Sequence, residues 1–380
     1  MAKKGNGEGS IYEHKRDGKR VGYRGAYWVH TADGPKRRYV SGKTRAEVNQ
    51  KLTKAMVERD GGLVFDAGAL TLGEYLKQWL SSSVRGMVRI RTFERYEQIC
   101  RVHLIPALGP VKLKNLTPVH VRALYREKLD SGLSPRTVEY IHTTLHKALK
   151  QAVMDGLIPR NVTDAVKAPK ASKKEVQPLT PEEVRTLLET ACGDSLEALY
   201  VLAITTGLRE GELLGLKWED VDFAAKTLSV RRTLSQTKQK GPILTPTKNS
   251  TGRSVKLTPT ALDALRRHKV AQNAERLNLG TLWSDHGLIF PAQTGKPMHP
   301  WVLYKGSFKR LLARAGIKRP VRFHDLRHTC ATLLLGKSIS PKIVQELLGH
   351  STITTTLNTY SHVLPTMQDQ AAEAMESVVP

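Results

Sequence analysis

The chain has 380 residues, which is too many for one ordinary hydrophobic core, so its length predicts two or three domains. Its 60 Lys and Arg outnumber its 35 Asp and Glu and give a net charge of +25, which concentrates polyanions near the surface. The positive charge is spread along the chain and is not confined to one tail, which indicates a nucleic-acid partner. Ribosomal and chaperone-like proteins are basic for similar reasons, so the charge alone does not separate them from DNA enzymes.

Cysteine usage and hydropathy narrow the expected cellular context. Cys100, Cys192 and Cys330 lack C-x-x-C spacing, so the sequence predicts neither a disulfide framework nor a zinc site. The first residues contain no apolar signal region, and no later stretch has the length of a membrane span. We therefore expect a protein of a reducing cytoplasm with no membrane partner.

Residues 1–65 predict a three-stranded β-sheet backed by a helix. Three short β-like runs are separated by Asp-Gly pairs, which favour hairpins because both residues tolerate positive φ. The runs are Ser10–His14, Tyr23–His30 and Arg37–Val40. Thr44 and Glu47 form a capping-box pattern that starts a helix through about Glu58.

Basic and aromatic residues are interleaved on these strands, a combination that suits entry into a groove of duplex DNA. The expected DNA contacts are Arg20, Arg24, Lys36, Arg37 and Arg38, which lie among Tyr23, Tyr27, Trp28 and Tyr39. Because a strand alternates faces, about half of the aromatic residues should cover the helix instead.

Residues 66–168 predict an all-helical domain. A hydroxyl residue stands at each expected helix start, Thr71, Thr117 and Ser134, and proline follows the last two. The last long helix has one apolar face. Its members are Val138, Ile141, Leu145, Leu149 and Ala152. Arg136 and Lys150 lie elsewhere around this helix and are expected to contact DNA phosphates.

A linker rich in proline and lysine, residues 169–178, precedes a third domain, residues 179–365, and a tail, residues 366–380. The tail has two interpretations: a short amphipathic helix that docks on a neighbouring protomer, or a disordered terminus. The expected fold class is multidomain α+β, with a mainly α third domain that contains a small β-sheet.

The third domain carries residue types suited to phosphate chemistry. Arg209 leaves a glycine-containing turn, with Glu212 three residues on to orient it. Three strands are predicted next, and the turn 248–252 between the last two puts Lys248 at a hairpin tip. The strands are Ser229–Arg232, Ile243–Thr247 and Arg253–Leu257. Lys238 and Lys240 are close enough to compete with Lys248 for a catalytic role.

Two further groups follow along the chain. His324 and Arg327 stand one turn apart on a single helical face. Another helix, started by Ser340-Pro341, ends before His350, and Tyr360 lies on the next helical stretch. We interpret His328 and Cys330, which share the helix of His324, as core or supporting residues.

The order of these residues resembles the tyrosine recombinase family. The strings TGLREGELLGLKWEDVD, HDLRHTCAT and LLGHSTITTTLNTYSHV are similar to its signature boxes. The residues that match its catalytic set are Arg209, Lys248, His324, Arg327, His350 and Tyr360.

This resemblance implies a phage or conjugative-element integrase that inserts, and also excises, a mobile element in a prokaryotic cell. It implies a tetramer on DNA and an accessory directionality factor. Residues 1–65 look like the domain that binds arm-type sites in such integrases, and residues 66–168 resemble the domain that binds core sites. The expected partner is therefore double-stranded DNA with both kinds of attachment site.

The expected chemistry assigns one role to each side chain. Protonated Arg209 and Arg327 clamp the scissile phosphate, and His350 adds a hydrogen bond to it. Tyr360 attacks phosphorus to form a 3′-phosphotyrosine while His324 assists its proton, and Lys248 protonates the leaving 5′ oxygen. Glu212 orients Arg209. Because the phosphotyrosine bond conserves the energy of the broken phosphodiester, we expect neither ATP nor a metal as cofactor.

Three other functions compete with this prediction. A type IB topoisomerase uses similar chemistry but joins no second site, and the N-terminal β-domain and the tail argue against it. A DNA-binding protein without catalysis accounts for the charge but not for the ordered catalytic set. A metal-dependent nuclease needs clustered carboxylates, whereas those near the motifs are dispersed. They are Glu210, Glu212, Asp325 and Glu346.

Overall fold

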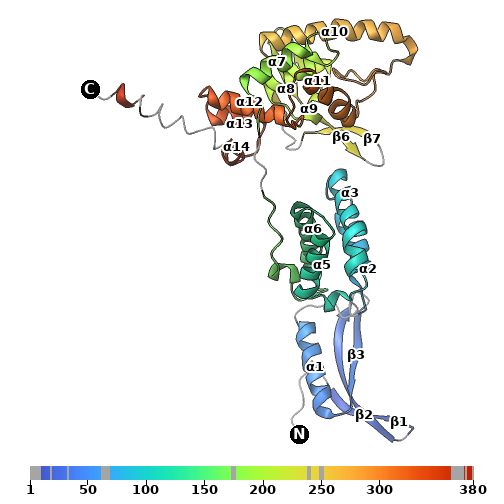
Figure 1. Ribbon diagram of the computed structural model, residues 1–380. Helices are drawn as coiled ribbons and strands as arrows, with labels where there is room; N and C mark the ends of the chain where they lie inside the picture. The colour runs from blue at the N-terminus through green and yellow to red at the C-terminus, as the bar shows by residue number, and fades with distance from the viewer. Residues whose placement is uncertain are drawn as a thin grey trace. The chain divides into compact units, whose positions relative to one another are not determined.

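The structure, a computed structural model, describes residues 10–17, 19–31, 34–60, 69–172, 177–237, 241–247, 252–360, 372 and 375–378. They belong to two compact units, Met1–Ser172 and Lys173–Pro380. The first contains a three-stranded sheet with a helix, followed by a group of helices, and the second is mainly helical with small sheets (Figure 1). The predicted multidomain α+β class is confirmed.

The N-terminal sheet has three antiparallel strands in sequence order, β1 (Ser10–Arg16), β2 (Lys19–Thr31) and β3 (Gly34–Gly42). Helix α1 (Arg45–Asp60) begins after Thr44, whose hydroxyl accepts the backbone N–H of Glu47 at 3.2 Å. The helix packs on the sheet closely, because a Cβ at Gly25 would lie 3.0 Å from Cγ1 of Val48. The predicted strands and helix are therefore all present.

Cross-strand pairing sorts the basic and aromatic side chains of this sheet onto two faces, since directly paired residues share a face. Tyr27 pairs with Arg38, and Val29 pairs with Lys36. Tyr27 and Val29 are buried on the side that α1 covers. Lys36 and Arg38 therefore point to the side of the helix.

The opposite side, which we call the aromatic face, consists of Arg24, Trp28, Arg37 and Tyr39. Trp28 pairs with Arg37, and these two alternate with the buried positions along their strands. Trp28 is 54 % exposed and Tyr39 is 49 % exposed. The guanidinium groups of Arg24 and Arg37 lie 5.3 and 5.8 Å from the ring centre of Tyr39. Strand alternation therefore divides the basic residues expected to contact DNA between the two faces.

The helices between residues 72 and 165 share one hydrophobic core. The starts predicted at Thr71, Thr117 and Ser134 are confirmed, since each hydroxyl accepts the backbone N–H three residues on. The predicted apolar face of the last long helix is confirmed, because all five of its members are fully buried. The elements are α2 (Leu72–Trp79), η2 (Leu80–Val84), α3 (Ile90–Ile99), η3 (Cys100–Leu104), α4 (Ile105–Leu108), η4 (Leu113–Asn115), α5 (Pro118–Asp130), α6 (Pro135–Met154) and η5 (Val162–Ala165).

The second unit is built around α8 (Glu197–Thr206), which is buried along nearly its whole length because it is apolar on all sides. It contacts α7, α9, α10 and α12. The other helical elements are α7 (Pro181–Ala191), α9 (Glu210–Leu214), η6 (Trp218–Asp220), α10 (Pro259–Leu279), η7 (Gly280–Leu282), η8 (Val302–Phe308), α11 (Lys309–Arg314), α12 (Asp325–Gly336), α13 (Pro341–Leu348) and α14 (Ile353–Tyr360).

The strands of this unit form two separate sheets. One contains β4 (Val221–Asp222), β5 (Thr227–Val230) and β8 (Arg253–Lys256), and the other is a hairpin of β6 (Arg232–Thr237) and β7 (Gly241–Pro246). The expectation that 248–252 forms a hairpin tip is wrong, because β7 pairs with β6 whereas β8 pairs with β5. The reason is burial: Leu228, Val230 and Val255 belong to the main core, which requires β8 beside β5.

The segment after α14 is described only at Ala372 and residues 375–378, where Met375 and Val378 are exposed. The rest of the predicted docking tail lies outside the described residues. In the part of the chain that is described, no helix is long and apolar enough to cross a membrane.

Candidate active site

Two glycines hold the α8–α9 turn against the end of α13. Gly207 ends α8 with a φ of +60°, and a Cβ there would lie 2.6 Å from Cδ2 of Leu348. Gly349 ends α13 with a φ of +64°, and its Cβ would lie 2.8 Å from Nη1 of Arg253. Both positions favour glycine for the left-handed backbone and for the close approach. The result is that Arg209 lies next to the backbone that leads into His350.

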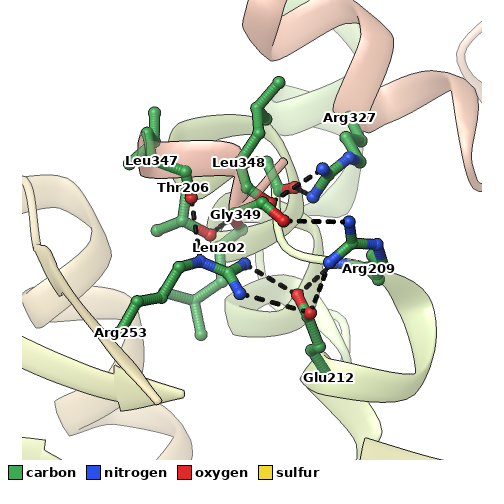
Figure 2. Close-up of polar contacts among 10 residues, drawn as sticks. Leu202, Thr206, Arg209, Glu212, Arg253, Arg327, Leu347, Leu348 and Gly349 are labelled. Atoms are coloured by element: carbon green, nitrogen blue, oxygen red, sulfur yellow. Dashed lines mark hydrogen bonds and ion pairs between the residues drawn. The ribbon is translucent and has the colours of Figure 1, made fainter. Parts of the chain in front are cut away.

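The carboxylate of Glu212 lies between the guanidinium groups of Arg209 and Arg253 (Figure 2). Its Oε1 accepts from Nη1 of Arg209 at 2.8 Å, and its Oε2 accepts from Nη2 of Arg253 at 2.8 Å. The Glu212 side chain is only 4 % exposed. Burial opposes its ionisation, but hydrogen bonds and charge from Arg253, and then from Arg209, outweigh burial and lower the pKa of Glu212 to about 2.

Arg209 and Arg253 each reach from this carboxylate to the end of α13. Nη2 of Arg209 donates to the carbonyl oxygen of Gly349 at 3.3 Å, and Nε of Arg253 donates to that of Leu347 at 3.0 Å. Sequence reasoning singled out Arg209 but missed Arg253. A basic residue at the start of a strand is an ordinary surface pattern, so only its place beside Glu212 reveals its contribution.

Arg327 projects from α12 into the same place and is almost fully buried, with 3 % of its surface exposed. Two of its N–H groups donate to backbone carbonyls, Nη1 to Gly207 and Nη2 to Leu348, both at 2.8 Å. Burial and the nearby charge of Arg209 lower the pKa of Arg327 to about 10, which leaves it protonated at neutral pH. Arg209 and Arg327 are distant in sequence, and the structure places their guanidinium groups together at the end of α13.

His350 follows the Gly349 turn and is half-buried. Its Nδ1 lies 2.8 Å from the hydroxyl oxygen of Thr356. Burial, and then the positive charges of Arg327 and Arg209, lower the pKa of His350 to about 4, so the imidazole is neutral at pH 7. If the threonine hydroxyl donates to Nδ1, the proton of the ring is on Nε2, where it can be donated to a ligand.

Tyr360, the last residue of α14, is buried against α12 and α13, with 2 % of its surface exposed. Its hydroxyl lies 2.8 Å from Nδ1 of His328. The ring of His324 packs edge-on against His328, with 5.1 Å between ring centres. The hydroxyl is thus bonded to the histidine that the sequence suggested as a supporting residue, and His324 lies one ring further away.

The three candidate lysines, Lys238, Lys240 and Lys248, lie outside the described residues. Thr237 and Gly241, which flank the first two, pair at the end of the β6–β7 hairpin. Thr247 precedes Lys248 and is buried. The choice of lysine therefore remains a prediction from the sequence.

The two basic residues expected to bind DNA on α6 differ in their surroundings. Arg136 pairs with Glu139 at 2.7 Å and lies over the ring of Tyr140, with 4.7 Å to the ring centre. Lys150 is exposed. In the residues that the structure describes, no three His, Cys, Asp or Glu side chains are grouped so that they could hold a metal ion.

The sequence that carries this site was compared with known protein families and proteins. Residues 177–367 match the phage integrase family, and residues 71–129 match the SAM-like N-terminal domain of phage integrases. The chain is 32 % identical over 358 residues to a XerC-like tyrosine recombinase of Caldanaerobacter subterraneus subsp. tengcongensis, covering 89 % of this chain and 90 % of that protein.

The chain belongs to the phage integrase family. It is 25 % identical to the ICEBs1 integrase of Bacillus subtilis, over 76 % of this chain and 78 % of that protein. Among solved structures, the Tn1549 transposon integrase, in complex with a circular intermediate DNA, superposes with a TM-score of 0.68 and 25 % identity. That comparison covers 82 % of this chain and 100 % of the other. The chain is thus a tyrosine recombinase, a DNA strand transferase that integrates a mobile element.

Proposed function

We propose that Tyr360 is the nucleophile of this recombinase and forms a 3′-phosphotyrosine with the cleaved strand. The observation that carries the proposal is the meeting of Arg209 and Arg327 at the Gly349 turn, in the same unit as the buried hydroxyl of Tyr360. Two fixed positive charges stabilise the charge that develops on the phosphate oxygens during attack.

The other side chains complete the reaction. His350 donates from Nε2 to the scissile phosphate, and Glu212 fixes the orientation of Arg209 and does not react. The leaving 5′ oxygen takes its proton from a lysine, for which Lys248 is the first candidate and Lys238 and Lys240 are the others. His324 acts on the tyrosine proton only indirectly, because it contacts the ring of His328. No metal or ATP takes part.

The N-terminal parts of the chain bind the attachment DNA. Residues 1–65 bind arm-type sites through the aromatic face, where Arg24 and Arg37 surround Tyr39. Residues 66–168 bind core sites, and residues 179–365 carry out catalysis after the linker 169–178. The Tn1549 relative, solved with a circular intermediate DNA, supports DNA as the partner. The active assembly is a tetramer on DNA, assisted by a directionality factor, in the cytoplasm of a prokaryotic cell.

The nucleophile is tested by replacing Tyr360 with phenylalanine, which removes only the attacking oxygen. Tyr360→Phe keeps its fold and its affinity for a short core site, but forms no covalent protein–DNA adduct on a nicked substrate that traps the intermediate. A covalent adduct formed by this variant would overturn the assignment. Joining of two attachment sites by the unaltered protein separates a recombinase from a topoisomerase, which only relaxes DNA.

A further inference from the structure

The hydroxyl of Tyr360 is hydrogen-bonded to His328, and the tyrosine side chain is buried. The phenol packs in a cluster with Ala331, Leu335, Val344 and Leu348, and its Oη lies 2.8 Å from Nδ1 of His328. Burial raises the pKa of Tyr360 to about 12, so the hydroxyl keeps its proton at neutral pH. An attack on phosphorus requires that this proton leave, and His328 is the group in contact with it.

The groups around His328 keep it neutral. These are Asp325 and Arg327 on α12, Arg322 and His324 just before that helix, His350 after α13, and Tyr360 on α14. Asp325 is occupied by Arg322 through a 2.7 Å ion pair. Burial first, and then the charge that His324 can carry, lower the pKa of His328 to about 4, so that Nδ1 offers a lone pair at pH 7.

We propose that His328 is the proton acceptor for Tyr360, so that the catalytic set of this recombinase includes the histidine directly after Arg327. This inference rests on Tyr360 being the nucleophile. During cleavage Oη bonds to phosphorus, its proton passes to Nδ1 of His328, and the bond from phosphorus to the 5′ oxygen breaks. That oxygen takes a proton from the lysine. The lysine therefore loses its positive charge while His328 gains one. During rejoining, His328 returns the proton to the departing tyrosine.

The geometry favours His328 over His324 for this step. A general base must lie within hydrogen-bond reach of the proton that it takes, and only His328 of the two is bonded to the hydroxyl among the described contacts. Positioned bases typically contribute about 10²- to 10⁴-fold to a rate. Without the imidazole, the buried phenol has to ionise before it can attack.

The test measures single-turnover cleavage of a core site whose leaving 5′ oxygen is replaced by sulfur, which needs no proton. On this substrate the unaltered protein has a nearly flat profile between pH 6 and 8, because its base is already neutral. His328→Ala is slower by about 10²-fold or more at pH 7, and its rate rises about tenfold per pH unit because it depends on ionised phenol. His328→Asn behaves like His328→Ala, since an amide near the position of Nδ1 accepts a hydrogen bond but no proton.

A more acidic phenol provides the decisive comparison. Fluorotyrosine at position 360 restores most of the rate lost by His328→Ala, but none of that lost by His350→Ala, which acts on the phosphate. Affinity for the core site and thermal unfolding are measured for every variant. A His328→Asn rate equal to that of the unaltered protein, a flat pH profile for His328→Ala, or equal rescue of both variants would overturn the role of His328. An adduct formed by Tyr360→Phe would overturn the proposed function instead.

Discussion

Arg253 holds the carboxylate of Glu212 through two hydrogen bonds, Nη2 to Oε2 at 2.8 Å and Nη1 to Oε1 at 3.2 Å. The remaining nitrogen, Nε, donates to the carbonyl oxygen of Leu347 at 3.0 Å. One planar guanidinium therefore fixes both the carboxylate that orients Arg209 and the end of the helix that precedes His350 (Figure 2).

Replacing Arg253 should reduce cleavage more than DNA affinity. Arg253→Lys keeps the charge but not the planar fork, so it cannot make all three hydrogen bonds, and we expect both Arg253→Lys and Arg253→Ala to be slower. The expected loss is about 10- to 100-fold in the cleavage rate at saturating DNA, with the smaller effect for lysine. Arg231→Ala is the matched control, because Arg231 is 59 % exposed and lies 3.9 Å from Asp220. Cleavage rates of Arg253→Lys and Arg253→Ala that equal the rates of Arg231→Ala and of the unaltered protein would exclude a positioning role for Arg253.

Glu212 should make the free energy of unfolding of the second unit depend on pH in the acidic range. Its folded pKa, about 2, lies below the ordinary value of 4.5, so its stabilising contribution is complete above pH 4.5 and is lost as the pH falls toward 2. The contribution is on the order of 3 kcal/mol, and Glu212→Gln, which leaves the guanidinium groups of Arg209 and Arg253 without this counter-charge, removes it. Unfolding curves at several pH values should show the difference between the two proteins narrowing through this range. A difference that stays constant would contradict this account.

Cleavage should persist in excess EDTA, because charge neutralisation comes from Arg209 and Arg327, which no chelator removes. Loss of cleavage on chelation, and its recovery with Mg²⁺, would instead indicate a metal-dependent nuclease.

A cleavage assay with a modified substrate can identify the general acid, the residue that protonates the leaving 5′ oxygen. A sulfur in place of the leaving 5′ oxygen should rescue Lys248→Ala but not Arg327→Ala, since sulfur leaves without a proton whereas the phosphate charge still needs the arginine. Rescue of Lys238→Ala or Lys240→Ala, together with no rescue of Lys248→Ala, would reassign the acid and leave the rest of the mechanism unchanged.

Removing residues 1–65 should spare binding and cleavage of short core sites but impair integration on full-length attachment DNA. The proposed catalytic residues all lie at or beyond Arg209, whereas the N-terminal sheet is the surface proposed to bind arm-type DNA. Binding of the full chain should weaken with salt, with a log–log slope of about −0.9 per phosphate neutralised. Equal recombination by the truncated and the full-length protein would argue against a distinct arm-binding role.

The two faces of the sheet provide a matched pair of variants for this prediction. Arg37→Ala removes a charge from the aromatic face, and Lys36→Ala removes the same charge from the side of α1. Arg37→Ala should weaken arm-site binding and make the salt slope less steep by about 0.9, whereas Lys36→Ala should change both less. The reverse order of effects would assign DNA binding to the other face.

The sequence by itself determined the features that rest on local rules. Hydroxyl caps located the helix starts at Thr71, Thr117 and Ser134, and helical spacing identified the buried face of α6. Ordered motifs were enough to indicate the recombinase family, because each box keeps its residues within one short stretch of the chain. These signals depend on neighbours in sequence, which can be read without knowing the fold.

Tertiary structure alone decided which distant groups meet. Strands β7 and β8 look like one hairpin in sequence, but burial of Val255 beside Leu228 pairs β8 with β5. Arg253 on β8 and Glu212 on α9 are distant in sequence, as are His328 on α12 and Tyr360 on α14, and each pair meets only in the folded unit. The partner of a single arginine or histidine cannot be predicted from the residues next to it in sequence. Such a contact is strong only in a buried site, and the whole fold creates that site.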